Sequence, residues 1–217
     1  PENIDSKTGI FIEPISLGIN CARFLRDNKK ILGMGISTIS ALFYRILDEN
    51  MLKKFYFLVE NERDKMVCKK LNIKNTLPLE DLDNQIPTFD TILDFYGSSS
   101  KLNSYLLKLK PKSKIYLFGV VDEELSLNYH QVISNEISVQ GIHGYSSEHL
   151  KQENRYKTDI EQAVEILASN KIEVNDLISN TINQNEIKNF FVNTCFDRTR
   201  KNIPIESFKF RTIVKNK

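Results

Sequence analysis

The sequence predicts an α/β fold in which helices cover both faces of a doubly wound parallel sheet. Short apolar runs alternate with longer amphipathic segments along the 217 residues, which is the pattern of strand–helix–strand units. Residues 55–59, FYFLV, are apolar throughout, as expected of a strand buried on both faces. A turn containing Gly33 and Gly35 joins an apolar strand to an amphipathic helix. All three features favour parallel strands connected by helices.

The first half of the chain supplies strands with helices between them. Residues 14–26 predict a helix, because Ile15, Ile19, Ala22 and Phe24 fall near one helical face. Strands are expected at residues 31–34, 55–59 and 91–95, and helices at residues 37–49 and 61–71. The segment 76–88 holds two prolines and an acidic cluster, so we interpret it as an irregular connection.

The second half continues this alternation. A helix is expected at residues 100–109 and is stopped by Pro111, because proline disrupts a helix interior. Further strands are expected at residues 114–118, 136–139, 177–182 and 208–214, and helices at residues 147–169 and 183–195. We therefore divide the chain into a lead-in segment (1–28), a central α/β domain (29–183), whose ligand is considered below, and a C-terminal helix with a return strand (184–217).

Composition limits the classes of function. The formal net charge of +2 is close to balance, so we expect neither nucleic acid nor a membrane surface as partner. No apolar run approaches the ~20 residues that span a bilayer. The cysteines Cys21, Cys68 and Cys195 are far apart, and the three histidines lack the spacing of metal ligands, so the sequence predicts neither a disulfide framework nor a metal site. The cytosol, a reducing compartment, is the expected location.

Residues 29–40, KKILGMGISTIS, form the main candidate site. A dinucleotide-binding turn needs a strand, a tight turn and a helix N-terminus whose amides face a pyrophosphate. If Gly35 begins the G-x-G-x-x-G series, Ser37 and Ser40 take its second and third positions, with Thr38 and Ile39 between them. A serine hydroxyl can donate to a phosphate, but its Cβ crowds the backbone. Taken alone, such a degenerate turn also occurs without any ligand.

Two further candidates lie at the same predicted edge of the sheet. Glu60 follows residues 55–59, where an acid would accept hydrogen bonds from a ribose diol. Its charge favours NAD(H) over NADP(H), and the nearby Arg63 weakens that preference. Glu60 is equally well explained as an acid at the start of a helix. Gly97 follows the strand at residues 91–95, and Ser98 is a candidate cap of the next helix.

Four segments, taken in order, resemble the medium-chain (zinc-type alcohol dehydrogenase-like) dehydrogenases. IEPISLGINCARFL (12–25) is similar to the Glu-Pro segment that leads from their catalytic domain into their cofactor domain. ILGMGISTIS (31–40) is similar to their glycine turn, V-L-V-x-G-x-G-x-I-G. Residues 89–119 resemble their F-D-x-x-x-D-x-x-G stretch, and ISVQGIHGYSSEHL (137–150) resembles their L-x-I-x-G-S segment.

The resemblance implies a Rossmann-type sheet, a nicotinamide cofactor and hydride transfer to or from an alcohol or aldehyde. It also implies that residues 35–40 carry the pyrophosphate and that Glu60 meets the adenosine ribose. By the same resemblance, Gly97 and Gly119 border the nicotinamide half of the cleft. Glu13 would lie near a catalytic metal that another domain holds.

Departures from the family's pattern qualify these expectations. The N-terminal GroES-like catalytic domain, with its zinc ligands, is absent from this chain. Since the chain begins at Pro1 without a methionine, we expect it to be part of a longer polypeptide, with zinc bound only outside this chain. Phe95 and Tyr96 replace smaller residues of the family, and we expect them to fill part of the nicotinamide space. The family often dimerises through the sheet edge around residues 136–143, so a homodimer is expected.

Two other functions stay open on the sequence. Ser37, Ser40, Phe95 and Tyr96 also suit a non-catalytic descendant that binds nucleotide poorly and acts as a partner or scaffold. A glycine turn followed by an acid at the end of the next strand also suits an S-adenosylmethionine-dependent methyltransferase. The segment from Gly119 onward fits a dehydrogenase better.

Overall fold

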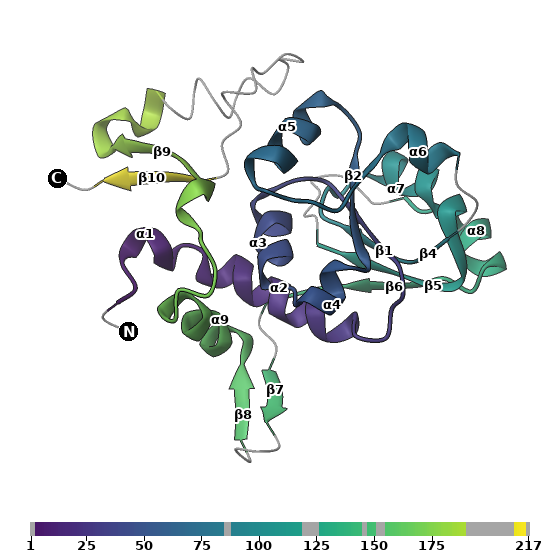
Figure 1. Cartoon of the computed structure of the whole chain (residues 1–217), viewed down its shortest axis with the longest axis horizontal. Helices are drawn as coiled ribbons and strands as arrows, with labels where there is room; N and C mark the ends of the chain where they lie inside the picture. Colours follow the sequence, from purple (N-terminus) through teal and green to yellow (C-terminus); the bar gives the residue numbers. More distant parts are fainter. Residues whose placement is uncertain are drawn as a thin grey trace.

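Six parallel strands form the central sheet of the computed structural model (Figure 1). The structure describes residues 3–84, 88–118, 126–144, 147–150, 155–189 and 211–215. The strands of this sheet are β1 (Ile31–Met34), β2 (Phe55–Val59), β3 (Thr76–Pro78), β4 (Phe89–Asp94), β5 (Leu109–Leu117) and β6 (Ser138–Gly141). Their order is β3-β2-β1-β4-β5-β6, and all neighbours are parallel. The order reverses between β1 and β4, and ligands of such sheets bind where it reverses, at the carboxyl ends of the strands.

Helices cover both faces of the sheet, which confirms the predicted doubly wound fold (Figure 1). The helices are α1 (Ser6–Gly9), α2 (Ile12–Phe24), α3 (Thr38–Ile46), α4 (Glu49–Leu52), α5 (Glu62–Lys70), α6 (Leu79–Asp83), α7 (Ser99–Tyr105), α8 (Tyr129–Ser134) and α9 (Asp159–Ala168). Successive side chains of a strand point to opposite faces. Ile31 therefore joins the core with α2, α3, α5 and α9, whereas Leu32 joins the core with α6 and α7.

Phenylalanine rings fill the core on the α3 side of the sheet. Phe43 of α3 packs against Phe55 of β2 with 5.5 Å between ring centroids, and against Phe95 with 5.6 Å. Phe95 also packs against Phe118 at 4.6 Å. Gly33 of β1 leaves room for these rings, because a Cβ at this position would lie 2.5 Å from the ring of Phe55. The cluster packs α3 against β2 and against the residues that follow β4 and β5.

The segment 76–88 is more regular than the sequence predicts. Residues 76–78 form β3, which pairs with β2 at the edge of the sheet, and α6 follows directly. Pro78 ends β3, and an edge strand tolerates the missing N–H of proline. A strand of three residues is too short to give a periodic signal. The expectation of an irregular connection is therefore wrong for residues 76–83.

The long helix predicted at residues 147–169 is also wrong. β7 (Ser147–Leu150) and β8 (Arg155–Thr158) form an antiparallel hairpin, and the helix is confined to α9. The Thr158 hydroxyl accepts from the N–H of Glu161 at 3.1 Å, and the Glu161 carboxylate accepts from the N–H of Thr158 at 2.7 Å. This capping box fixes the start of the helix at Asp159.

Two other segments differ from the predicted helices only in part. α7 ends at Tyr105, a 3-10 turn (Leu106–Lys108) follows it, and β5 then runs through Pro111. The helix predicted at residues 183–195 begins as a 3-10 turn at Gln184–Glu186, and residues 190–210 lie outside the described part of the chain. β9 (Ile178–Asn183) pairs in parallel with β10 (Arg211–Lys215), which confirms the predicted strands there.

Candidate functional site

The β1–α3 turn requires glycine at its first position. Gly35 has a φ of +88°, a conformation that side-chain-bearing residues rarely adopt. A Cβ on Gly35 would lie 3.0 Å from the Cβ of Tyr96 and 3.1 Å from its backbone nitrogen. Gly35 thus lets the turn after β1 pack directly against the turn after β4, at the switch in strand order.

The serines of the turn bond to each other. The Ser37 N–H donates to the Ser40 hydroxyl at 2.7 Å, and the Ser40 N–H donates to the Ser37 hydroxyl at 3.3 Å. The two side chains form a capping box at the start of α3, with Thr38 and Ile39 in the first helical turn. The strand, turn and helix N-terminus that a pyrophosphate needs are all present. The capping box nevertheless occupies amides that glycines would leave open to a phosphate.

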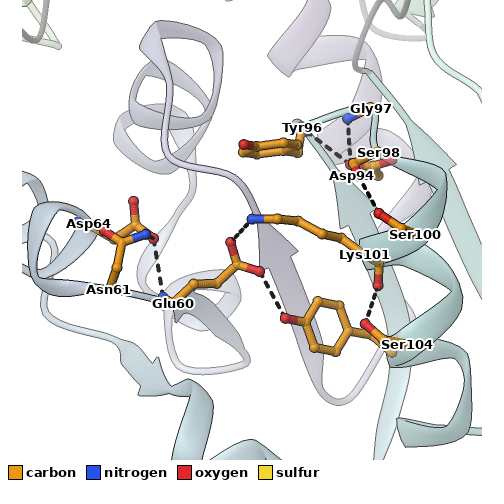
Figure 2. A network of polar contacts seen from close by, with 11 residues as sticks. Glu60, Asn61, Asp64, Asp94, Tyr96, Gly97, Ser98, Ser100, Lys101 and Ser104 are labelled. Atoms are coloured by element: carbon orange, nitrogen blue, oxygen red, sulfur yellow. Dashed lines mark hydrogen bonds and ion pairs between the residues drawn. The ribbon is translucent and has the colours of Figure 1, made fainter. Parts of the chain in front are cut away.

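Glu60 lies at the carboxyl end of β2 and has two partners on α7 (Figure 2). The Lys101 ammonium contacts one oxygen of its carboxylate. The Tyr105 hydroxyl donates to the other oxygen at 2.8 Å. From α5, Asp64 accepts the backbone N–H of Glu60 at 3.1 Å, and burial raises the pKa of Asp64 above its usual value. Glu60 is thus held in place from two sides.

The turn after β4 is built around Asp94. One oxygen of its carboxylate accepts the N–H groups of Tyr96 and Gly97, each at 2.9 Å. The other oxygen is buried without a hydrogen-bond partner, and burial raises the pKa of Asp94. Gly97 has a φ of +72°, so a glycine suits this position as well. The expected cap is not formed, because the Ser98 side chain makes no capping hydrogen bond to α7.

A cleft of about 250 Å³ joins these groups. Its lining includes the predicted residues Gly35, Ser37 and Glu60. Arg63, expected near Glu60, lines it as well, and so do Phe95 and Tyr96, which were expected to fill nicotinamide space. No site role was predicted for Ile36, Asn61, Asp64 and Lys101, which also line the cleft. Its volume is small beside the ~300–1,000 Å³ of typical ligand pockets. A larger cavity of about 610 Å³ adjoins the cleft at Glu60 and Asn61 and extends between α5 and β3.

Other predicted site residues lie outside the lining of this cleft. Thr38, Ile39 and Ser40 belong to the first turn of α3, and Ser40 is fully buried. Gly97 is held in the turn after β4. Gly119 lies outside the described residues.

Phe95 and Tyr96 take different environments. Phe95 is buried among the core rings, so most of its side chain fills the core. Tyr96 is 55% exposed, and its ring centroid lies 4.2 Å from the Lys101 nitrogen. The expectation that both fill nicotinamide space stays a prediction, and the structure adds that Tyr96 covers Lys101.

Glu13 lies in the first turn of α2 and is exposed. The neighbouring Ser16 hydroxyl lies 2.7 Å from the carbonyl oxygen of Glu13 and 2.9 Å from that of Gly144. The start of α2 is therefore close to the segment that follows β6. Within the described residues, no three His, Cys, Asp or Glu side chains are grouped so as to hold a metal ion. Within the same residues, no helix combines the length and the apolar character needed to cross a membrane.

The order of the sheet and the glycine turn between β1 and α3 together define a Rossmann-type fold. Comparison with solved structures agrees with this class. The chain superimposes on a putative zinc-binding dehydrogenase from Sinorhizobium meliloti bound to NADP with a TM-score of 0.71, at 13% identity, covering 99% of this chain and 60% of that one. For 2R,3R-butanediol dehydrogenase from Bacillus subtilis, the TM-score is 0.70 at 11% identity, and the match covers 100% of this chain and 60% of that one.

Sequence comparison also finds similarity to dehydrogenases. The chain is 23% identical over 211 residues to L-idonate 5-dehydrogenase from Vitis vinifera and 22% identical over 207 residues to sorbitol dehydrogenase from Arabidopsis thaliana. In each case the match covers 88% of this chain and 54% of the relative, so the chain spans about half the length of the curated relatives it matches. No model of a protein family matches the sequence. In these comparisons the chain is similar to dehydrogenases over about half of their length.

Proposed function

We propose that this chain is the nicotinamide-dinucleotide-binding portion of an oxidoreductase of the alcohol dehydrogenase type. The cleft between the Gly35 turn and Glu60 carries the proposal. The cleft lies after the neighbouring strands β1 and β2. On one side is the N-terminus of α3, which suits a pyrophosphate, and on the other is the Glu60 carboxylate, which suits a ribose. The relatives support it, because they are named as dehydrogenases and one solved relative is described as bound to NADP.

In this proposal the cofactor supplies the hydride, and the chain holds the cofactor in the orientation that the transfer needs. The turn formed by Gly35, Ser37, Thr38, Ile39 and Ser40 faces the pyrophosphate. Gly97 and Gly119 border the nicotinamide half of the cleft. An alcohol or aldehyde substrate would bind between this portion and a second domain, near Glu13, and that domain would hold any zinc.

The assembly and location are also proposals. β6 is an edge strand whose residues are exposed, which suits pairing with a second copy into a homodimer. Cys21 and Cys68 are free, buried thiols, which suits the reducing cytosol. The division at residues 28 and 183 is retained as a proposal for the longer polypeptide.

The preference for NAD(H) over NADP(H) was predicted from the negative charge of Glu60. In the structure Lys101 contacts that carboxylate. The proposal therefore covers both dinucleotides.

A second candidate function is a non-catalytic module that binds nucleotide poorly. The capping box of Ser37 and Ser40 favours it, because this box already bonds two amides of the phosphate-binding turn. The small volume of the cleft favours it as well.

A cofactor titration separates the two candidates. We would add NADH and then NADPH to the purified 217-residue chain and follow the emission of the cofactor. The chain contains no tryptophan, so protein emission interferes little. We expect saturable enhancement with at least one dinucleotide. No saturable signal from a chain shown to be folded by circular dichroism would favour the non-catalytic module.

A further inference from the structure

Lys101 lines the cleft but has no role in the proposed phosphate-binding turn. It lies in α7, and its side chain reaches across to the carboxylate of Glu60 at the end of β2 (Figure 2). The Tyr96 ring lies 4.2 Å from its nitrogen and covers it on one side. Tyr105 fixes the other oxygen of the Glu60 carboxylate at 2.8 Å. The Lys101 ammonium therefore lies between the Glu60 carboxylate and the Tyr96 ring, and Tyr105 holds that carboxylate in place.

Positive and negative side chains are equal in number at the Glu60 end of the cleft. Glu60 and Asp64 contribute two carboxylates, and Arg63 and Lys101 contribute two cations. An acid alone at the end of β2 accepts from a ribose diol and repels a 2′-phosphate. Here the ammonium in contact with Glu60 offsets that repulsion. A lysine carries three donors, so Lys101 can keep its bond to Glu60 and still donate to a phosphate oxygen.

We propose that Lys101 is the residue that determines which dinucleotide the cleft accepts, and that it admits the 2′-phosphate of NADPH beside Glu60. The inference rests on the proposed dinucleotide-binding function and deepens it. It predicts that NADPH binds this chain at least as tightly as NADH, which is the reverse of the preference expected from Glu60 alone.

The test compares Lys101→Met with a matched control, Lys70→Met. Methionine keeps much of the length of lysine and removes its charge. Lys70 is exposed at the C-terminal end of α5 and does not line the cleft. We expect Lys101→Met to weaken NADPH binding by about tenfold or more, the loss of one charge-assisted hydrogen bond, and to change NADH binding by about threefold or less. Lys70→Met should leave both affinities unchanged.

Glu60→Gln provides an independent test if Lys101→Met does not fold. It removes the negative charge and keeps the shape, so it should strengthen NADPH binding and weaken NADH binding. Equal weakening of both dinucleotides by Lys101→Met, or a wild-type chain that strongly prefers NADH, would overturn the role of Lys101 and leave dinucleotide binding intact. Failure of the folded wild-type chain to bind either dinucleotide would instead refute the proposed function, and the inference with it.

Discussion

The two ends of the cleft depart from the dinucleotide-binding pattern in different ways. In the β1–α3 turn, Gly35 takes a positive φ, while Ser37 and Ser40 stand at the second and third glycine positions of that pattern and bond to each other. After β2, Glu60 provides the acid of the pattern, but α7 supplies Lys101 and Tyr105 as its partners. The first difference is confined to one turn. The second comes from side chains on another helix, and it changes the charge at that end of the cleft.

The largest effect is expected from the position where the two turns touch. Gly35→Ala should lower the free energy of unfolding by on the order of 3 kcal/mol, because it adds a left-handed backbone penalty of ~1–2 kcal/mol to crowding against Tyr96. The matched control is Gly141→Ala on the edge strand β6, where a Cβ would meet nothing within 4 Å. Denaturant unfolding measures the free energy of unfolding of both variants. Equal effects at the two glycines would show that the turns do not pack as described.

A smaller effect is expected at Asp94, which holds the turn after β4. Asp94→Ala leaves the N–H groups of Tyr96 and Gly97 without their acceptor and should cost about 2 kcal/mol of unfolding free energy. Asp94→Asn keeps an acceptor oxygen and should cost less. If both variants were equally stable, the carboxylate would not organise this turn.

The pH dependence of the same variants has a defined sign. Burial raises the pKa of Asp94 above its ordinary value of 3.8, so the folded chain holds this proton more tightly than the unfolded chain. Wild-type stability should therefore fall relative to Asp94→Asn as the pH rises from 3.8 through the higher folded pKa. Unfolding curves of both proteins between acid and neutral pH provide the comparison. A difference that does not change with pH would contradict the burial of this carboxylate.

The smallest effect on stability is expected at the capping box. Ser37→Ala removes the cap of α3 and should cost about 1 kcal/mol, whereas Ser37→Gly should cost a few tenths. Ser37→Gly also removes a Cβ from the phosphate side of the turn, so we expect it to strengthen NADH binding by several-fold. Thermal unfolding tests the predicted loss of stability, and titration with NADH tests the predicted change in affinity. Weaker NADH binding in Ser37→Gly would mean that the hydroxyl itself contacts the phosphate.

The amino-acid sequence predicted the positions of strands better than the side-chain contacts between elements. The bounds of β1 and β2 were predicted without error, because their apolar runs end at Gly35 and Glu60. Strand β3 and the β7–β8 hairpin were missed, since three or four residues carry too little periodicity. The Gly35 turn and Glu60 were found because they adjoin strands. Lys101 was missed, because its contact with Glu60 joins residues 41 positions apart and depends on how α7 packs.

Hydrogen exchange with and without saturating NADH or NADPH tests most directly whether this cleft is the dinucleotide site. If the cleft is the site, protection should increase in the segments 35–40 and 95–101, which contain lining residues of the cleft. Residues 65–80, around the larger adjoining cavity, should change little. Protection confined to residues 65–80, or no protection anywhere in a folded chain at saturating cofactor, would contradict the assignment of the cleft.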